Sequence, residues 1–447
     1  MMLNKPKDKH LYELLSGATA TFILKLVGLG FGYLFLWLIS LYYGASTVGI
    51  FTLSFTLLQI TAIIGRFGLD TALLRFISED IGHKKFSKAF ETYKKASIVV
   101  LSFTLILTIV LYTLSPLLAE YIFKKPSLTI PFQTISLAII PMSLINLNFE
   151  TLRAFRHIKS YAFFQNVSVF FFTTLFIVFL IANHTPSIEI ITVFVYAVYI
   201  TCGLSFLFTL RIFQKCSYAK QCESRKTFFI LRTSLPMLIA GSLMLIMGWT
   251  DTIMIGIFKN ETDVGIYSIA LKISSVTSII LMAVNSMAAP KFAQQYSKKN
   301  FSELQHIVSR ASMLTFWATL PIVLFIVILS TPLLSIFGEE FTVAKNTLLI
   351  LIFGQLINAA SGSVGYLMQM TDNQKLFQYI IFLSLLINIV LNYLLIPTYS
   401  FEGAAIASAI SLITWNIISI IFVYKKLNIV TFYLPFFTKY KIEVNKK

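Results

Sequence analysis

Residues 17–43 read GATATFILKLVGLGFGYLFLWLISLYY and contain one charged residue, Lys25. About 20 consecutive apolar residues are enough for an α-helix to cross the hydrocarbon core of a bilayer. The stretch is also longer than the apolar region of a removable signal peptide, which has about 7–15 residues. It therefore predicts a retained membrane-spanning helix, and the rest of the chain repeats this pattern.

The composition of the whole chain agrees with a membrane location. Of its 447 residues, 57% are hydrophobic and 12% are charged, whereas about a quarter are charged in an ordinary soluble domain. So few polar groups cannot cover a surface in water, which excludes a soluble globular fold. Apolar runs between polar breaks predict an all-α polytopic membrane protein with twelve transmembrane helices. These are expected at 17–43, 48–68, 96–114, 131–152, 161–181, 189–210, 235–258, 264–288, 311–330, 346–369, 378–397 and 403–424.

The distribution of positive charge predicts the orientation. The chain has 36 Lys and Arg against 19 Asp and Glu, a net charge of +17. Most of these cations lie in the tails and in alternate loops, while the opposite loops hold Lys124, Lys125, Lys259 and Lys345. Short positive loops stay in the cytoplasm, so both termini are expected there. The positive charge then faces anionic lipid headgroups, and no nucleic-acid partner is expected.

An internal repeat divides the chain into halves. Its offset is constant at 216 residues, the separation of Val48 from Val264. The matching pairs are Val48-Gly49-Ile50-Phe51 with Val264-Gly265-Ile266-Tyr267, Arg75-Phe76 with Lys291-Phe292, Ser115-Pro116-Leu117-Leu118 with Thr331-Pro332-Leu333-Leu334, and Lys159 with Lys375.

The repeat predicts two six-helix lobes in the same orientation. The N-terminal lobe is expected at 1–210 and the C-terminal lobe at 234–424, with a cytoplasmic linker at 211–233 and a basic cytoplasmic tail at 425–447. A pseudo-twofold axis along the membrane normal relates such halves, and substrate sites in transporters of this kind lie between them. We therefore expect a central cavity.

Three charged residues lie inside predicted spanning helices, where charge is costly and generally faces a partner or a water-filled cavity. They are Lys25, Lys272 and Asp251. Asp251 and Lys272 have similar expected depths, so a structural ion pair is one interpretation and a shared place in the cavity lining is the other. The long stem of Lys25 could instead carry its charge to the headgroups. A lumen with two lysines and one aspartate would favour an anionic solute.

Arg75 and Lys291 occupy equivalent positions of the repeat, at the expected cytoplasmic ends of the second and eighth helices. As a pair they would form a cytoplasmic gate that attracts a phosphate headgroup. Ordinary positive-inside anchoring explains them equally well.

Catalytic and metal-binding patterns are missing from the sequence. Cys216 and Cys222 lie in a basic loop with a spacing that matches no zinc motif. The chain has no P-loop, no nucleophile with its base and no carboxylate pair. We therefore expect no metal site, no cofactor and no enzymatic activity.

Several motifs of the second half resemble one family of membrane proteins. The motifs are Ser234-Leu235-Pro236, Gly248-Trp249-Thr250-Asp251-Thr252, Asp263-Val264-Gly265-Ile266-Tyr267, Ala283-Val284-Asn285-Ser286, Ala289-Pro290-Lys291-Phe292 and Gly354-Gln355-Leu356-Ile357-Asn358-Ala359-Ala360-Ser361-Gly362. With them the chain resembles the Wzx-type oligosaccharide flippases, also called the polysaccharide biosynthesis protein family, of the multidrug/oligosaccharidyl-lipid/polysaccharide exporter superfamily. The likeness covers nearly the whole chain and is strongest from 234 to 372.

The resemblance implies a V-shaped cavity lined by helices one, two, seven and eight, three of which carry Lys25, Asp251 and Lys272. It implies a flippase that moves oligosaccharide repeat units linked to undecaprenyl pyrophosphate across the bacterial inner membrane by alternating access. Such a protein would serve the synthesis of O-antigen, capsule or exopolysaccharide. Its partners would be the lipid-linked oligosaccharide and membrane lipid, with a polysaccharide polymerase and a chain-length regulator as further candidates. Asn285 is a candidate for sugar recognition.

Two other functions stay open. An ion-coupled drug or metabolite antiporter of the same superfamily would favour acidic lumen residues for cationic drugs, whereas this lumen is expected to be positive. A membrane glycan polymerase or ligase would need an outer catalytic platform, and the predicted outer loops are short. The sequence does not indicate whether a proton or a sodium ion drives transport.

Overall fold

The computed structural model describes residues 9–183, 189–216, 225–433 and 435. These residues form helices and no strand, which confirms the predicted all-α class. The chain divides into two compact units, unit 1 (Met1–Ser242) and unit 2 (Leu243–Lys447). Cys222 and most of the predicted basic tail lie outside the described residues.

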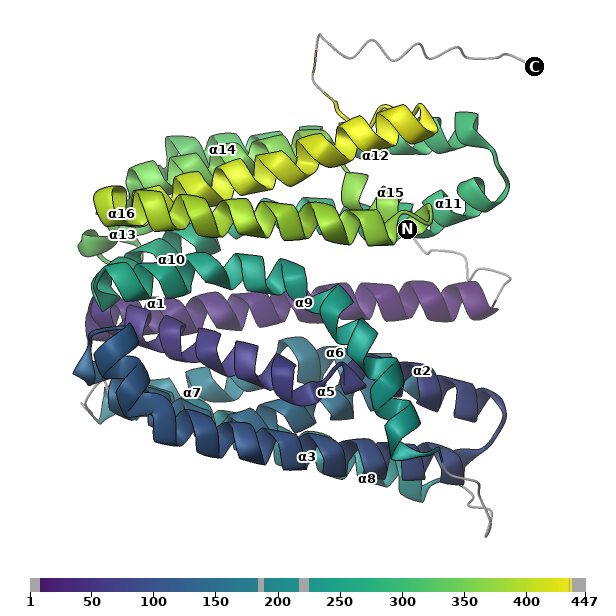
Figure 1. Ribbon diagram of the computed structural model, residues 1–447, viewed down its shortest axis with the longest axis horizontal. Coiled ribbons are helices and arrows are strands. Elements are labelled where there is room, and N and C mark those ends of the chain that lie inside the picture. Colours follow the sequence, from purple (N-terminus) through teal and green to yellow (C-terminus); the bar gives the residue numbers. More distant parts are fainter. Residues whose placement is uncertain (1–8, 184–188, 217–224, 434, 436–447) are drawn as a thin grey trace, which may run out of the picture. The chain divides into compact units, whose positions relative to one another are not determined.

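Unit 1 begins with a helical pair. Its first element, α1 (Lys9–Arg66), reverses at Gly44, whose φ of 79° is readily adopted only by glycine (Figure 1). The elements that follow are α2 (Leu69–Gly82), α3 (Phe86–Leu117), η1 (Leu118–Ile122), η2 (Pro126–Leu128), α4 (Thr129–Ser136), α5 (Ile139–Ala154), α6 (Ile158–Asn166), α7 (Ser168–Ala182) and α8 (Glu189–Gln214).

Unit 2 ends with a second helical pair. The long α16 (Gln374–Leu427) reverses at Ser400, where φ is 48°. A Cβ at Gly403 would lie 2.5 Å from the carbonyl oxygen of Leu395, so only glycine allows the two arms to come this close after the turn. The preceding elements are α9 (Thr227–Phe258), which crosses the boundary between the units, α10 (Glu261–Ser275), α11 (Ser278–Ser297), α12 (Phe301–Ile328), α13 (Ser330–Ser335), η3 (Glu339–Ala344), α14 (Lys345–Ser361) and α15 (Val364–Met370).

All twelve predicted spanning segments coincide with helices. Six helices of the described chain are long and apolar enough to cross a membrane, or nine if each bent pair of helices counts as one span. The bends are 41° between α4 and α5, 46° between α6 and α7, and 43° between α10 and α11. The reversals in α1 and α16 divide two of these spans, and the apolar part of α9, Leu245–Phe258, supplies the last segment.

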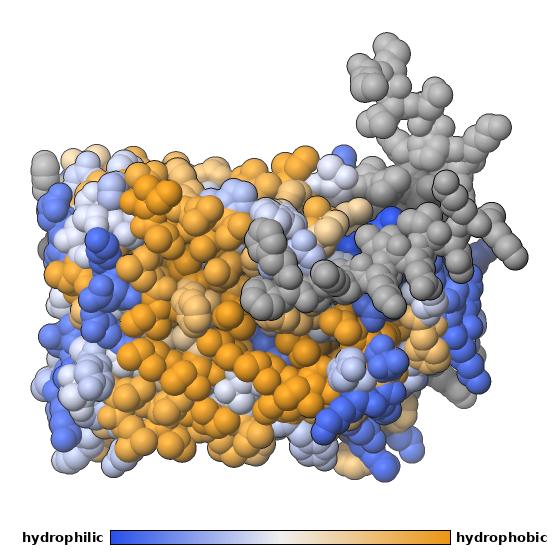
Figure 2. Space-filling model, turned by 90° about the horizontal axis from the view of Figure 1, so that it is seen from above, coloured by the Kyte–Doolittle hydropathy of each residue, from blue (hydrophilic) through white to orange (hydrophobic). Residues whose placement is uncertain are grey.

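The spanning helices turn apolar side chains outward. Ile106, Phe179 and Ile328 are 57%, 67% and 75% exposed. Hydroxyl groups within these helices bond to their own backbone, as Thr104 does to the carbonyl oxygen of Val100 at 2.6 Å. On the face that Figure 2 shows, an apolar band lies between hydrophilic ends. This distribution fits lipid contact, because apolar side chains prefer hydrocarbon to water.

The internal repeat is visible in the helix boundaries. Both α6 and α16 begin at equivalent positions, since Gln374 follows Ile158 by the repeat offset of 216 residues. The residues two positions earlier, Arg156 and Asp372, both have left-handed backbone conformations, with φ of 61° and 59°. The two halves therefore share a turn geometry that the sequence match did not include.

The start of α9 is tied to unit 1. The Arg225 guanidinium contacts the carboxylate of Asp80, lies 3.4 Å from Glu79 and covers the ring of Phe76 at 4.8 Å. The Lys95 ammonium donates to the Arg225 carbonyl at 2.9 Å. The expected linker at 211–233 thus contains the end of α8 and the beginning of α9, and the domain limits drawn from the repeat stay a prediction.

A short segment after α16, residues 428–433, returns along α12 and α14. Its Val430 exchanges two hydrogen bonds with the amide of Gln305, one of 2.7 Å to the backbone N–H and one of 2.9 Å to the carbonyl. The Tyr433 N–H donates to the carbonyl of Ala360 at 2.8 Å, and its hydroxyl accepts from the Trp317 indole at 3.0 Å. We call this segment the C-terminal strap.

Candidate functional site

Asp251, on α9, is a buried carboxylate inside a predicted spanning segment, and it is 1% exposed. Four neutral side chains of unit 2 donate hydrogen bonds to it. They are Tyr267 Oη at 2.7 Å, Asn388 Nδ2 at 3.0 Å, Asn392 Nδ2 at 2.7 Å and Ser408 Oγ. Lys272 is not among these partners. The dipoles of neutral groups therefore stabilise the charge on Asp251, and the ion pair considered from the sequence does not form.

Two elements, α10 and the two arms of α16, bring the donors of this Asp251 cluster together. Tyr267 comes from α10, the helix that follows α9 directly, and its side chain is fully buried. Asn388 and Asn392 are one turn apart on the first arm of α16, so they share one face of the helix. Ser408 comes from the second arm, after the reversal. The cluster therefore depends on the turn of α16 as well as on the helices themselves.

Two polar contacts tie that turn to the connection between α9 and α10. The Ser400 hydroxyl donates to Asp263 Oδ2 at 2.7 Å, and the Lys259 ammonium donates to the carbonyl of Pro397 at 3.0 Å. At the start of α10 the Asn260 side chain accepts from the Asp263 N–H at 2.7 Å, which caps the helix. The register between α10 and α16 is thus set at the helix ends.

The Asp251 cluster contains an acceptor that is not used. Asn388 Oδ1 accepts from Asn392 Nδ2 at 3.1 Å, but the buried Oδ1 of Asn392 has no hydrogen-bond partner among the described residues. A buried acceptor without a partner costs about 1–3 kcal/mol. A carboxylate beside amide and hydroxyl oxygens is chemically suited to a proton or to a hard cation that prefers oxygen.

Lys25 and Lys272, the two expected lumen lysines, are both half-buried. Lys25 lies in the first arm of α1 and belongs to unit 1. Lys272 lies in the last turn of α10, next to the bend into α11, and belongs to unit 2. Each unit thus has a lysine within a spanning segment, and their joint role in a cationic lumen stays a prediction.

The remaining predicted site residues lie on α2 and α11. Arg75 and Lys291 are both exposed, and their role as a gate stays a prediction. Asn285 is 4% exposed, and its buried Oδ1 has no partner among the residues that the structure describes. The role of Asn285 in sugar recognition stays a prediction.

The sequence analysis missed four members of the Asp251 cluster: Tyr267, Asn388, Asn392 and Ser408. A signal was present for two of them, because two asparagines one turn apart in an otherwise apolar run are costly in lipid unless they face a polar partner. Tyr267 and Ser408 carried no such signal, since tyrosine and serine are common in spanning helices.

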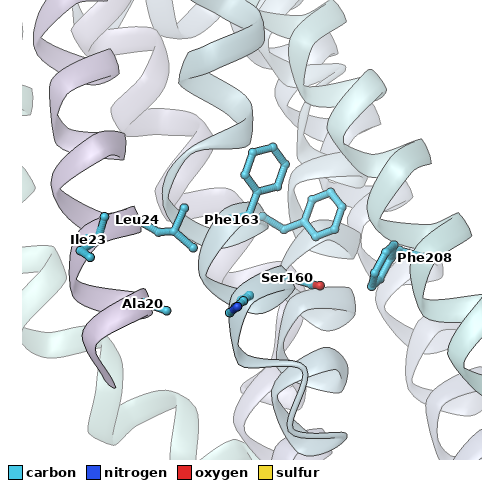
Figure 3. Close-up of a pocket in the computed structure, with 8 residues that line it drawn as sticks. Ala20, Ile23, Leu24, Ser160, Phe163 and Phe208 are labelled. Carbon is cyan, nitrogen blue, oxygen red and sulfur yellow. The ribbon is translucent and has the colours of Figure 1, made fainter. Parts of the chain in front are cut away.

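Unit 1 contains an apolar groove of about 620 Å³ between α1, α6 and α8. Figure 3 shows Ala20, Ile23 and Leu24 of α1 on one side and Phe208 of α8 on the other, with Phe163 between them. The polar residues of its lining are Ser160 and Lys159. A groove with so few hydrogen-bonding groups suits hydrocarbon and not a glycan.

Comparison with known proteins places these features in a family. The model of the polysaccharide biosynthesis protein family matches residues 14–296, and the model named MatE matches residues 236–394. A probable low-salt glycan biosynthesis flippase of Haloferax volcanii, Agl15, is 29% identical over 164 residues, which cover 36% of this chain and 35% of the relative. An uncharacterized membrane protein of Methanocaldococcus jannaschii is 22% identical over 379 residues, which cover 81% of this chain and 74% of the relative.

Two solved structures share the fold. The lipid II flippase MurJ in an inward closed conformation superimposes with a TM-score of 0.74 at 16% identity, over 92% of this chain and 87% of MurJ. An inward-facing multidrug resistance transporter of the MATE family superimposes with a TM-score of 0.72 at 14% identity, over 91% of this chain and 98% of the transporter. The match to the polysaccharide biosynthesis protein family, over residues 14–296, covers more than half of the chain, and it agrees with the resemblance seen in the sequence motifs. The chain belongs to the polysaccharide biosynthesis protein family.

Proposed function

We propose that this protein is a flippase that moves oligosaccharide repeat units linked to undecaprenyl pyrophosphate across the bacterial inner membrane, with both termini in the cytoplasm. The relatives named above as flippases support the general activity, although the matched segment spans only 35% of Agl15. The lipid carrier, the bacterial membrane and the service to surface polysaccharide synthesis are parts of the proposal.

The observation that carries the proposal is a half-buried lysine within a spanning segment of each unit, Lys25 and Lys272. Charge at this depth is costly and is generally kept for function. Two cations match the two phosphates of a pyrophosphate-linked substrate. The choice of an anionic substrate over a cationic drug follows from these two lysines.

The mechanism in the proposal is alternating access. Moving sugar hydroxyl groups into hydrocarbon without hydrogen-bond partners costs several kcal/mol for each group, so the glycan must cross in a polar cavity while the polyprenyl tail stays in lipid. The Asp251 cluster would supply the energy coupling, because its carboxylate can take up and release one cation. Both a proton and a sodium ion fit its oxygen donors, and the test described in the Discussion separates them.

Neutralising both lysines is the first test. We expect Lys25→Gln combined with Lys272→Gln to slow translocation by at least about 100-fold, because each charged contact contributes about 1.5–3 kcal/mol and 1.4 kcal/mol is a factor of ten. The measurement is the rate at which a fluorescent undecaprenyl-pyrophosphate oligosaccharide crosses the bilayer of liposomes, followed with an impermeant quencher. Lys345→Gln removes an exposed lysine at the start of α14 and should leave the rate unchanged. Full activity of the double variant would contradict the cationic lumen.

A drug or metabolite antiporter is the second candidate, because the MatE model matches residues 236–394 and this range includes Asp251 and Lys272. In this case the purified protein would exchange a cationic dye for protons or sodium in liposomes and would leave the lipid-linked oligosaccharide in its original leaflet. The two measurements can be made on the same preparation.

A further inference from the structure

A second polar site lies in unit 2, away from the Asp251 cluster. It is a cavity of about 470 Å³ between the consecutive helices α11 and α12, within the range of roughly 300–1,000 Å³ that is typical of small-molecule pockets. We call it the α11–α12 cavity. One continuous face of each helix lines it, since the lining residues recur at intervals of three and four positions.

The α11 side of the cavity changes polarity with depth. The helix runs from the bend at Ser278 toward the basic side of the membrane, which the positive-inside rule assigns to the cytoplasm. Its deeper lining residues are apolar, and those nearer the basic end are polar. In chain order they are Val284, Met287, Ala288, Lys291, Gln294 and Gln295.

The α12 side changes polarity in the same direction in space. This helix starts at the basic side, so its chain order is reversed relative to depth. Glu303, His306 and Arg310, with the apolar Ile307 among them, line the part nearer the basic side, and Ala311 and Leu314 line the deeper part. The two helices thus build one cavity with a polar half at headgroup depth and an apolar half at hydrocarbon depth.

The apolar half of the cavity is exposed. Met287 is 72% exposed and Leu314 is 59% exposed, and both belong to the lining. At a rise of about 1.5 Å per residue, Met287 lies roughly 6 Å deeper than Lys291, and Leu314 lies roughly 6 Å deeper than Arg310. A single amphiphile could therefore contact the cations and the apolar residues at the same time.

The polar half combines cations with groups that bind hydroxyls. Lys291 and Arg310 are exposed, and no ion pair joins either of them to Glu303 in the described part of the chain. Ammonium and guanidinium groups bind phosphate oxygens. A carboxylate repels phosphate but accepts hydrogen bonds from hydroxyl groups, as Glu303 would here. This combination fits a phosphorylated sugar better than a plain phospholipid headgroup.

We propose that the α11–α12 cavity is the receptor in the cytoplasmic leaflet for the lipid-linked sugar, with its phosphates on Lys291 and Arg310, its first sugar at Glu303, and its isoprenoid chain along Met287 and Leu314. The inference rests on the proposed function, because it takes the substrate class from there. It adds Arg310, Glu303 and the two apolar residues to a site for which the sequence supplied only Lys291.

The test measures binding of undecaprenyl pyrophosphate to the full chain in phosphatidylcholine nanodiscs. Lys291→Gln combined with Arg310→Gln is expected to weaken binding by at least about ten-fold. Lys298→Gln combined with Lys299→Gln removes the same charge from the adjacent turn, outside the cavity lining, and should leave binding unchanged. Unchanged binding by the first double variant, or an equal loss in the control, would overturn the assignment.

Further measurements identify which parts of the ligand the cavity binds. Inorganic pyrophosphate should bind more weakly than the isoprenoid form, because it cannot contact Met287 and Leu314. Phosphatidylglycerol added to the nanodiscs should not displace undecaprenyl pyrophosphate at equal concentration; if it does, the cavity is a general anionic-lipid site and the proposal is wrong. Glu303→Gln should weaken binding of the sugar-bearing form relative to the sugar-free form, because it removes a carboxylate that accepts from hydroxyl groups and repels phosphate. The reverse pattern would also overturn the proposal.

Failure of this inference can be told apart from failure of the proposed function. A protein that translocates the oligosaccharide but binds undecaprenyl pyrophosphate equally well after the Lys291 and Arg310 changes retains the proposed function and loses the receptor. A protein that binds through the cavity but never translocates retains the receptor and loses the flippase.

Discussion

Asp251→Asn is expected to abolish gradient-driven translocation while the protein stays folded. Asparagine has nearly the same shape, and its carbonyl oxygen still accepts hydrogen bonds from Tyr267 and Ser408. Its amide N–H groups face Asn388 and Asn392, and the unused Oδ1 of Asn392 can accept from them once that amide turns over, so packing around the site is kept. It cannot take up a proton or pair with a metal cation, so the coupling step is lost. In liposomes with an imposed sodium or pH gradient, the rate should fall by at least about ten-fold, to the level without a gradient. The gradient that drives the wild type identifies the ion.

Two companion variants separate coupling from folding. Asp263→Asn changes a carboxylate at the start of α10 that accepts a hydrogen bond from Ser400, and it should keep gradient-driven transport. Asp251→Ala should lower thermal stability as well as transport, because it leaves four donors without an acceptor at about 1–3 kcal/mol for each buried group. If Asp251→Asn keeps the gradient dependence of the wild type, the carboxylate is not the coupling group.

Gly28→Val is expected to destabilise unit 1 severely. A Cβ at Gly28, on α1, would lie 2.1 Å from the carbonyl oxygen of Asn166 and 2.6 Å from its carbonyl carbon, on α6. These are backbone atoms, so no side-chain rotation can relieve the clash and the two helices must separate. Overpacking of this kind costs about 3 kcal/mol or more, which corresponds to a fall of roughly 6–12 °C in the melting temperature of a unit of this size.

The neighbouring glycine on the same helix is the matched control. A Cβ at Gly30 would meet no atom within 4 Å, so Gly30→Val should leave the melting temperature within about 2 °C of the wild type, since Val costs a helix slightly less than Gly does. Melting can be followed by size-exclusion chromatography of fluorescently labelled protein in detergent. Equal losses for the two variants would mean that the close approach of α1 and α6 is not what Gly28 provides.

Hydropathy alone was enough to locate the helices, because crossing a bilayer demands length and apolarity that few other structures need. All twelve segments coincide with helices for this reason. The breaks within spans were less visible. Pro141 marks the bend between α4 and α5, because it has no N–H to bond to the carbonyl of Leu137 at the break. The bend between α6 and α7 falls at Asn166-Val167-Ser168, where no glycine or proline marks it. Hydropathy does not show the second bend, so the sequence predicts a single helix from 161 to 181.

Among the functional residues, the sequence identified the buried charge but not the residues that contact it. Asp251 stood out because a carboxylate in an apolar helix is rare, yet its partners could not be identified from the chain. Ser408 lies 157 positions from Asp251, and it reaches the carboxylate only because α16 reverses at Ser400. The sequence also suggested Lys272 as the partner of Asp251, since it compared expected depth and not direction around the helix axis. The depth of a residue along its helix can be estimated from its position in the sequence. The direction in which its side chain points depends on how the helices pack.

The C-terminal strap has a practical consequence for anyone who shortens or tags the protein. Gln305 serves Val430 as a neighbouring β-strand would, because it offers one donor and one acceptor to the same residue. Deleting the chain from residue 428 onward would remove both bonds of that amide to Val430, leaving its Nε2 with Ser309, and would free the carbonyl of Ala360 as well. Expression versions should therefore retain Tyr433, and a fluorescent or affinity label is best attached beyond it.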